Sequence, residues 1–313
     1  MLHVMAGVLR DARGRVLLAQ RPPGKHLAGF WEFPGGKLEP GELPQLALAR
    51  ELREELDVQI EPQHGIPLIR IPWHQGERGL LLDAWQFTQW KGEPRPLEGQ
   101  ALQWRLPRDV DLSTLAPADR PVLQALRLPA IYAITPSDVP PDHAEPWYAR
   151  VVAALDRGVG LIQLRLPLWS VDEVRALAAR LQPHAMRCGA GLLLNGDVEG
   201  ALRLGEGIGV HLKAAQLDQL KERPLPWRQW VGASCHNAEQ LAKGAHIADF
   251  AMLSPVAATA SHPEASALGW PHFQALAEAA ALPVYALGGM APAMAEEARR
   301  HGAQGVAGIG AFW

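Results

Sequence analysis

The chain is short of cysteine, of net charge and of long apolar segments. Its 313 residues include only two cysteines, Cys188 and Cys235, which excludes a disulfide framework and favours a reducing compartment. A formal net charge of −3 argues against a general nucleic-acid coat or a membrane-surface protein, because both usually need a basic excess. No secretory signal and no run of about 18 apolar residues is evident, so we expect a cytoplasmic protein without a membrane span.

What is present is the material for two folded domains. Hydrophobic residues make up 48% of the chain and charged residues 20%, which is enough to bury a sizeable core. A length of 313 residues is long for one domain and comfortable for two.

The first part of the chain has more predicted strands than helices. Apolar runs at 4–9 and 16–19 flank a turn with Asp11 and Gly14, which predicts a hairpin. Further strands are expected at 66–71 and 80–87, and helices at 44–56 and 121–127. Asp119 is a candidate N-cap of the second helix. This order indicates an α+β domain over residues 1–128.

From about residue 130 the pattern becomes a regular alternation of strand and helix. Helices are expected, for example, at 171–186, 238–243 and 291–300. Eight such units favour a (β/α)8 barrel over 129–313, with a doubly wound sheet as the alternative. The chain reaches Trp313 soon after the eighth strand, so the eighth outer helix is expected to be missing. Its seam would be covered by the first domain, by another subunit, or left exposed. The eight predicted strands are 131–134, 160–164, 191–194, 208–212, 230–233, 250–253, 284–287 and 305–309.

The strongest chemical signal is a Gly-rich loop that leads into an acidic helix. At about 100° per residue, Glu51, Glu54 and Glu55 share one helix face, while leucines form another face that would dock on a sheet. Three converging carboxylates repel one another unless a cation joins them, and hard oxygen ligands select Mg²⁺ or Mn²⁺. Gly35 and Gly36 would let the backbone approach closely. The alternative is a solvated helix face with ordinary charge pairs.

This stretch resembles the Nudix box, with Gly36, Glu42, Arg50, Glu51, Leu52, Glu54, Glu55 and Val58 at the fixed spacing and Asp57 where the family has Gly. Residues 1–128 are most similar to the MutT branch, which hydrolyses oxidised guanine nucleoside triphosphates. The resemblance implies that Glu51, Glu54, Glu55 and the Gly35 carbonyl bind Mg²⁺, that Arg50 organises the carboxylates, and that Glu54 activates water.

The same resemblance suggests where the substrate binds. Arg21 and His26 fall where the MutT branch contacts phosphates and sugar, and Phe33 lies in the segment before the box. The branch carries Asn near the position of Asp119, so guanine recognition here requires a protonated Asp or other contacts. A further Glu of the branch is matched to Gln103.

The second part resembles thiamine phosphate synthase and its TenI relatives, through segments such as Gln163-Leu164-Arg165 and Gly288-Gly289-Met290. Positions that carry Lys and two metal-binding Asp in the synthase fall at Pro167, at Gly196 and near Ala215 or Gln216, so synthase activity is not expected. Surviving phosphate-binding candidates are Arg165, Gly288, Gly289, Gly308 and Gly310. A TenI-like proton shift would use His262, and a scaffold without ligand is the alternative.

Three functions follow for the fused chain. The first is a Mg²⁺-dependent 8-oxo-dGTP diphosphatase that sanitises the nucleotide pool and releases monophosphate and pyrophosphate. In the second, the barrel binds a phosphorylated thiazole or thiamine compound, and the Nudix domain cleaves a thiamine-linked diphosphate. In the third, the barrel is a sensor or interaction module. Direct binding of nucleic acid is not expected in any of them.

Overall fold

The computed structural model describes residues 1–75, 78–258 and 266–313. The chain divides into two compact units, Met1–Arg127 and Leu128–Trp313, which are described separately below. We retain 1–128 and 129–313 as the proposed domain limits. None of the helices within the described residues is long and apolar enough to cross a membrane.

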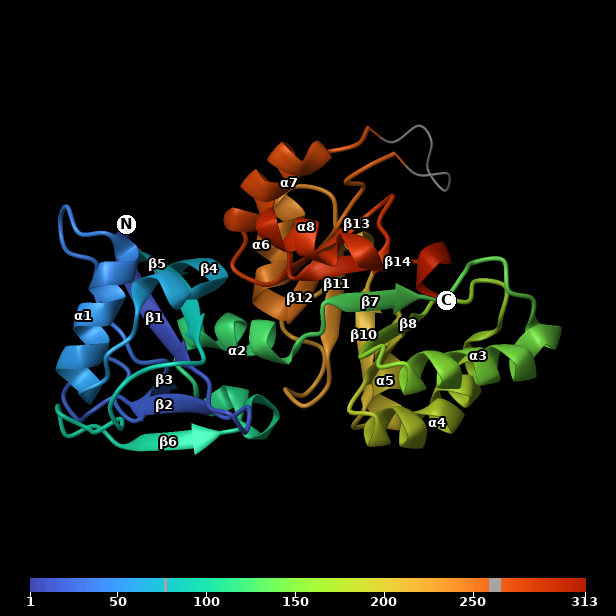
Figure 1. The fold of residues 1–313 in the computed structure, drawn as a ribbon. Coiled ribbons are helices and arrows are strands. Elements are labelled where there is room, and N and C mark those ends of the chain that lie inside the picture. The colour runs from blue at the N-terminus through green and yellow to red at the C-terminus, as the bar shows by residue number, and fades with distance from the viewer. Residues whose placement is uncertain (76–77, 259–265) are drawn as a thin grey trace. The chain divides into compact units, whose positions relative to one another are not determined.

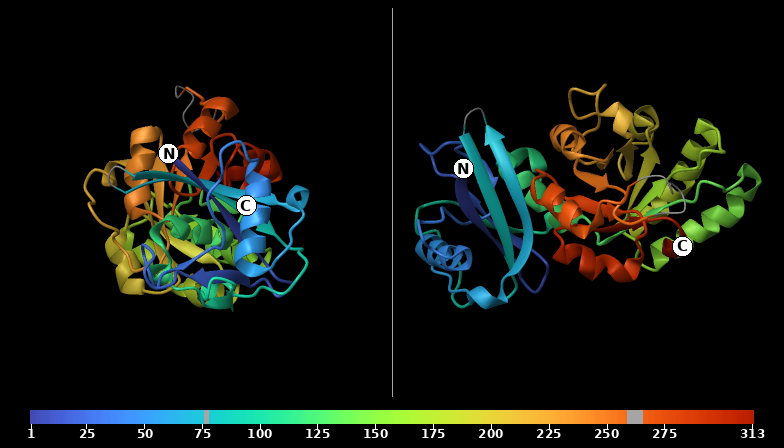
Figure 2. Two further views of the ribbon diagram at one scale, coloured as in Figure 1. Left: turned by 90° about the vertical axis from the view of Figure 1, so that its left-hand side faces the viewer. Right: turned by 90° about the horizontal axis from the view of Figure 1, so that it is seen from above.

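The first unit contains two three-stranded sheets (Figure 1). One has the order β1-β5-β4, with β1 parallel to β5 and β5 antiparallel to β4. The other has the order β3-β2-β6 and is antiparallel throughout. The long β4–β5 pair is seen in the view from above in Figure 2. The strands are β1 Leu2–Leu9, β2 Val16–Gln20, β3 Trp31–Glu32, β4 Ile66–Gln75, β5 Arg78–Phe87 and β6 Leu102–Arg105.

The predicted hairpin of the first two strands is wrong, although its turn is present. Asp11 accepts the backbone N–H groups of Arg13 and Arg15 through Oδ1, and the chain reverses there. β1, however, pairs with β5 along its whole length, whereas β2 pairs with β3 and β6. A single bridge between Arg10 and Val16 joins the two strands. Pairing with distant strands has therefore overridden the local hairpin signal.

Helix α1 spans Pro44–Leu56, as predicted. Its apolar face is fully buried against β1 and β2 residues, which stabilises the unit by about 1.5–3 kcal/mol for each large side chain. Asp57 takes the left-handed conformation with φ 57°; its N–H donates to the Arg53 carbonyl, and the next N–H, that of Val58, donates to the Leu52 carbonyl. Asp57 thus performs the helix-ending role that Gly usually has, at a modest conformational cost. The buried α1 residues are Ala47, Leu48, Leu52 and Leu56.

Helix α2 spans Arg120–Arg127 and packs on β4. Asp119 does not act as the expected N-cap. It lies within the short 3₁₀ turn η4, and its carboxylate Oδ1 accepts a hydrogen bond from the distant backbone of Phe33. The 3₁₀ turns of this unit are η1 Pro62–His64, η2 Pro107–Asp109, η3 Leu112–Thr114 and η4 Pro117–Asp119.

The second unit is a closed barrel of eight parallel strands, so the predicted fold class is confirmed. Each predicted run corresponds to one strand, with limits that differ by two residues at most. The barrel interior is filled by aromatic rings, in which Tyr132, Phe250 and Tyr285 lie 5.4–5.6 Å apart between centroids. The strands are β7 Ile131–Ile134, β8 Leu161–Leu164, β9 Gly191–Asn195, β10 Ile208–Leu212, β11 Val231–Cys235, β12 Phe250–Leu253, β13 Val284–Leu287 and β14 Gly305–Gly308.

The helices surround this barrel unevenly (Figures 1 and 2). The helix expected at 291–300 is divided into a 3₁₀ turn and the short α8. Only 3₁₀ turns follow β10 and β14 in the described chain, and the terminal Trp313 donates its Nε1–H to the Ile134 carbonyl at 2.8 Å. The elements are η5 Pro141–His143, α3 Ala144–Asp156, α4 Val171–Arg187, α5 Val198–Leu204, η6 Ala214–Gln216, α6 Ala238–Ile247, α7 Gly269–Glu278, η7 Pro292–Met294, α8 Ala295–Arg300 and η8 Gly310–Phe312.

Candidate functional site

The Gly-rich loop of the first unit is held directly against β1. The backbone N–H of Met5 donates to the Gly36 carbonyl at 2.8 Å, and that of Gly7 donates to the Pro34 carbonyl at 2.7 Å. A Cβ atom on Gly36 would lie 2.2 Å from the Glu51 carboxylate, and one on Gly35 would lie 2.1 Å from the Met5 carbonyl oxygen. The two glycines therefore let α1 bring a carboxylate onto the loop backbone.

Arg50 connects the acidic residues of this region. Its Nη1 donates to Glu51 Oε1 at 2.8 Å and to Glu54 Oε2 at 3.3 Å. Its Nε and Nη2 donate to the two oxygens of Glu42, and Nη2 also reaches the Lys37 carbonyl at 3.2 Å. These hydrogen bonds, first with Glu42 and then with Glu51, raise the pKa of Arg50 above its ordinary value. Arg50 thus holds two of the predicted metal ligands in place.

Glu55 lies deeper in the same cluster. Its Oε2 accepts the N–H of Gly35 at 3.3 Å. Burial raises the pKa of Glu55 to about 7, and the charges of Glu98, Glu51 and Glu32 add to this rise. A carboxyl that is half protonated near neutral pH, mainly because it is buried and in addition because of its like-charged neighbours, is one that a bound cation would return to its ionised form.

The cluster has the composition of a site for a hard divalent cation. Glu51 is largely buried, with 16% of its side chain exposed, whereas Glu54 is open to solvent at 61%. The Gly35 carbonyl accepts no hydrogen bond from the residues that the structure describes. Carboxylate and carbonyl oxygens are the ligands that Mg²⁺ and Mn²⁺ prefer, so Glu51, Glu54, Glu55 and Gly35 have the chemistry for such an ion. Their side chains would have to draw together to bind it, because the ligand oxygens of the three glutamates do not all lie within 4.8 Å of one another in the described structure.

Sequence reasoning missed one acidic residue of this cluster. Glu98 acts on the pKa of Glu55 through its charge, and its Oε2 contacts Lys25 Nζ at 2.7 Å. The position matched from sequence, Gln103, instead accepts a hydrogen bond from Arg105 on strand β6. Glu98 stands in an irregular Pro- and Gly-containing segment without periodicity. No local pattern signals its proximity to Glu55, which is a tertiary relationship.

The residues predicted to bind substrate form a second, partly separate group. Asp119 is fully buried and accepts the Phe33 N–H at 2.9 Å. Burial raises the pKa of Asp119 to about 8, with a further contribution from the charge of Glu32. Arg21 is engaged with Glu32 at 2.6 Å and with the His26 carbonyl, while the His26 side chain is exposed. Burial also raises the pKa of Glu32, against the opposing effect of Arg21.

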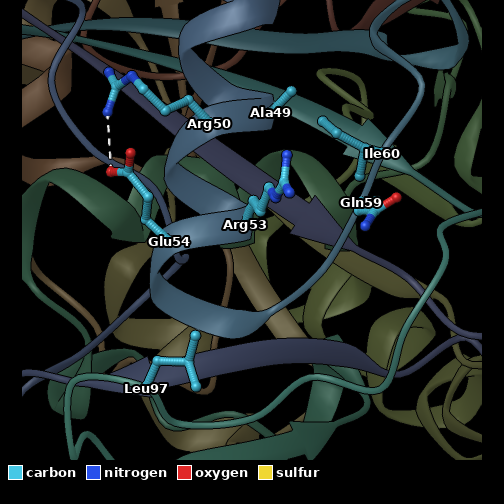
Figure 3. Close-up of a pocket in the computed structure, with 7 residues that line it drawn as sticks. All are labelled: Ala49, Arg50, Arg53, Glu54, Gln59, Ile60 and Leu97. Atoms are coloured by element: carbon cyan, nitrogen blue, oxygen red, sulfur yellow. Dashed lines mark hydrogen bonds and ion pairs between the residues drawn. The ribbon is translucent and has the colours of Figure 1, made fainter.

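An open hollow of about 660 Å³ lies along α1 (Figure 3). Arg50 and Glu54, which belong to the carboxylate cluster, form part of its lining. Arg53 lies on the other flank, on the same side of the helix as Gln59 and Ile60 (Figure 3). The hollow therefore reaches from the cluster along the exposed side of α1. Its lining residues are Ala49, Arg50, Arg53, Glu54, Gln59, Ile60 and Leu97.

The barrel candidates lie at the end of strand β14 or directly after strands β8, β13 and β14. The Arg165 backbone is tied to the Thr135 hydroxyl, and its guanidinium has no ion-pair partner among the described residues. Gly308 is explained by packing, because a Cβ atom there would lie 2.2 Å from the Phe312 ring. Gly288 is explained in the same way, because a Cβ atom on it would lie 2.9 Å from the Pro255 Cα. A Cβ atom on Gly310 would meet nothing within 4 Å, so this position is open.

Other polar groups inside the barrel are paired with one another. His211 is fully buried, with Tyr132 Oη at 3.1 Å from Nδ1 and Ser234 Oγ at 3.0 Å from Nε2. Burial lowers the pKa of His211 to about 3, so its ring is neutral. Gln163 donates to the Asn195 side chain at 3.1 Å. His262, the candidate for a proton shift, lies outside the described residues.

Comparison with known proteins accounts for both units. Residues 1–126 match the NUDIX domain and residues 131–312 match thiamine monophosphate synthase, and the chain belongs to both families. As a Nudix hydrolase it acts on diphosphate linkages, and enzymes of this family generally use a divalent metal ion.

Several individual proteins are similar to one part of the chain. The CTP pyrophosphohydrolase of Escherichia coli is 40% identical over 44% of this chain and 98% of its own length. The 8-oxo-dGTP diphosphatase of the same organism is 34% identical over 40% of this chain and 96% of its own length. A putative thiamine-phosphate synthase 2 of Aquifex aeolicus is 33% identical over 60% of this chain and 99% of its own.

Solved structures also match each unit. The E. coli ORF135 protein has a TM-score of 0.36 at 40% identity, covering 40% of this chain and 86% of that one. The thiamine phosphate pyrophosphorylase from Pyrococcus furiosus has a TM-score of 0.46 at 22% identity, covering 57% of this chain and 84% of that one.

Proposed function

We propose that the first unit hydrolyses nucleoside triphosphates in a Mg²⁺-dependent reaction, with 8-oxo-dGTP as its main substrate, and releases monophosphate and pyrophosphate. The observation that carries this proposal is the carboxylate cluster of α1, in which Arg50 joins Glu51 and Glu54 and the Gly35 N–H donates to Glu55. Relatives named 8-oxo-dGTP diphosphatase in two species, E. coli and Proteus vulgaris, support the substrate class.

In this proposal Glu51, Glu54, Glu55 and the Gly35 carbonyl would hold Mg²⁺. When bound, the ion would neutralise phosphoryl oxygens and lower the pKa of a bound water. Glu54 is the exposed member of the cluster, and it would orient the attacking water and accept its proton. Arg50 keeps Glu54 from turning away, because its guanidinium is also anchored to Glu42 and to the Lys37 carbonyl.

The base would be recognised at Asp119 and Phe33. A carboxyl with a pKa of about 8 is protonated at neutral pH, so it donates through one oxygen and accepts through the other. The accepting oxygen is occupied by the Phe33 N–H, which leaves the acidic proton for a base oxygen or nitrogen. A neutral Asp can thus supply the donor that Asn supplies in the MutT branch. Arg21 would orient Glu32 and the backbone of His26, with the exposed His26 ring nearest the sugar.

CTP is the competing nucleotide, because the E. coli CTP pyrophosphohydrolase is 40% identical to this part of the chain. Cytosine also offers acceptors to a protonated carboxyl. Release of pyrophosphate from 8-oxo-dGTP, dGTP, CTP and dCTP, measured at equal concentrations with Mg²⁺, separates the two. A higher kcat/KM for CTP than for 8-oxo-dGTP would overturn the preferred substrate while leaving the reaction class in place.

The barrel supports a second candidate function, the binding of a phosphorylated ligand such as thiazole phosphate or thiamine phosphate. Arg165 and Lys213 are cationic, their backbone N–H groups bond to Thr135 and Gln216, and their side chains form no ion pair among the described residues. The backbone N–H of Gly310 likewise donates to no described acceptor. Calorimetry with thiazole phosphate, thiamine phosphate and inorganic phosphate tests this function. Binding that is lost in Arg165→Ala supports it, and no binding in the millimolar range leaves the barrel as a scaffold.

A further inference from the structure

Three side chains of different ligand chemistry meet on the outside of the barrel, where helices α3 and α4 end. α3 ends at Asp156, and α4 ends at Arg187 with Cys188 as the next residue. The two helices pack side by side (Figure 1). One ligand atom from each of Asp156, His184 and Cys188 lies within 4.8 Å of the other two.

The spacing along the chain favours this convergence. His184 and Cys188 are four residues apart at the end of one helix, so their side chains leave on the same face. Asp156 comes from the neighbouring helix, and its Oδ1 lies 2.7 Å from His184 Nε2. The Cys188 thiol is free and exposed, so an ion has access to it. Thiolate and imidazole select zinc-like ions over Mg²⁺, and a carboxylate completes such sites.

The electrostatics of the location also favour a cation. α3 and α4 both present their C-terminal ends here, where helix dipoles place partial negative charge. A cation already contacts the cluster, because Arg187 Nη2 lies 3.1 Å from His184 Nδ1. A guanidinium can only donate, so Nδ1 carries the lone pair and the ring proton sits on Nε2, facing Asp156.

We propose that Asp156, His184 and Cys188 bind Zn²⁺ as a site that joins α3 to α4, independent of the hydrolytic cluster. Around a tetrahedral ion with bonds of roughly 2.0–2.3 Å, ligand atoms lie about 3.5 Å apart. The 2.7 Å contact between His184 and Asp156 would therefore open to admit the ion, and the 4.8 Å limit on the other separations leaves the thiol within reach of it. Zinc on Nε2 moves the ring proton to Nδ1, so Arg187 leaves that nitrogen, and the thiol proton passes to solvent.

Cobalt titration of the full chain tests this site, because a Co²⁺–thiolate bond gives a charge-transfer absorption that a carboxylate cluster cannot give. Excess Mg²⁺ occupies the Nudix carboxylates during the titration. We expect the band to saturate at one equivalent of Co²⁺ and to disappear when Zn²⁺ is added. Absence of the band in the wild-type protein would overturn the proposal.

Two cysteine variants show whether the absorption band comes from Cys188 or from Cys235. Cys188→Ser should remove the band and weaken Co²⁺ binding, because the thiolate ligand is lost. The matched control Cys235→Ser should keep it, because Cys235 is buried on strand β11. Arg187→Ala should tighten binding, since the competing guanidinium is gone. A band that survives in Cys188→Ser, or weaker binding in Arg187→Ala, would contradict the site. Unchanged nucleotide turnover and circular dichroism in each variant verify that the fold is intact.

Discussion

Asp119 and Phe33 are 86 positions apart in the chain, yet the Asp119 carboxylate Oδ1 accepts the Phe33 backbone N–H at 2.9 Å. This bond ties the turn before α2 to the segment that precedes the Gly-rich loop. It also fixes the orientation of a fully buried carboxyl whose pKa is raised to about 8, mainly by burial. The relationship therefore connects the proposed base site to the loop of the carboxylate cluster.

The first prediction concerns the pH dependence of base recognition. Below pH 8 Asp119 is protonated and can donate to the base, and above pH 8 it ionises and can only accept. We expect the KM of the wild-type enzyme for its nucleotide to rise as pH increases through about 8. In Asp119→Asn, which donates at every pH, KM should stay flat over the same interval. Steady-state kinetics between pH 6.5 and 9.5 check this, and identical profiles would contradict it.

The same shift predicts a pH dependence of stability. The unfolded pKa is 3.8 and the folded pKa is about 8, so the folded state binds more protons between these values. The stabilising effect of the neutral carboxyl is complete below pH 3.8 and is lost as pH rises toward 8. We expect the free energy of unfolding of wild type relative to Asp119→Asn to decline from pH 5 to 8. Denaturant melts of both proteins measure this difference in the free energy of unfolding. A difference that stays constant from pH 5 to 8 would contradict the prediction.

The third prediction concerns Glu54. Glu54→Gln keeps the side-chain volume and an oxygen for Arg50 but removes the charge and the basicity needed to activate water. We expect kcat to fall by about 10²–10⁴-fold with an unchanged thermal midpoint. The matched control is Glu61→Gln, which changes an exposed glutamate outside the cluster and should leave kcat within twofold of wild type. Equal turnover of the two variants would remove Glu54 from the mechanism.

The fourth prediction uses the opposing charges of Glu98 and Lys25. Glu98→Gln removes a negative charge that raises the pKa of Glu55, and the pKa of Glu55 should therefore fall. Because the negative potential at the cluster becomes weaker, the Mg²⁺ concentration for half-maximal activity should rise. Lys25→Ala releases Glu98 from its 2.7 Å contact and should shift the Mg²⁺ requirement in the opposite direction. Metal titrations of turnover in the two variants measure these shifts. Shifts of the same sign would contradict the assignment of Glu98 to the cluster.

The fifth prediction concerns the stability of the barrel. Arg223 and Asp249 form a bidentate ion pair, with Nη1–Oδ1 and Nη2–Oδ2 distances of 2.8 Å each. Only 2% of the Asp249 side chain is exposed. Asp249→Ala leaves the arginine buried without this partner and also removes the acceptor of the Val231 N–H, so it should cost about 3–5 kcal/mol. Asp218→Ala breaks a solvent-exposed pair with Lys243, which water and salt screen, so it should lower the free energy of unfolding far less. Chemical denaturation compares the two variants, and similar losses would contradict the difference.

The features predicted from sequence were those with a local or repeating cause. Helix α1 combines an early proline with leucines at helical spacing, so both of its limits followed from the sequence. The barrel repeats a strand–helix pattern eight times, so the number of its strands could be predicted from the sequence. The β1–β2 hairpin failed because β1 pairs with β5, about 80 positions further along the chain. A turn signal alone does not decide which strand a neighbour pairs with.

The candidate site divides in the same way. The residues of the Nudix box lie within one loop and one helix, so their spacing was informative. Glu98 lies near Glu55 only because the chain folds back, with Leu97 N bonded to the Glu55 carbonyl at 3.1 Å. Arg21 stays a predicted phosphate-binding residue, and the structure adds that its guanidinium contacts Glu32 and the His26 carbonyl. These partners depend on side-chain directions that the sequence pattern does not contain.

The central claim is that the carboxylate cluster of α1 cleaves nucleoside triphosphates between the α- and β-phosphates with a divalent ion. Phosphorus NMR of the products formed from 8-oxo-dGTP by the wild-type protein, with and without Mg²⁺, tests it most directly. The account predicts monophosphate and pyrophosphate in equal amounts, only when Mg²⁺ is present. Orthophosphate with nucleoside diphosphate, or equal turnover in the presence of a chelator, would contradict it.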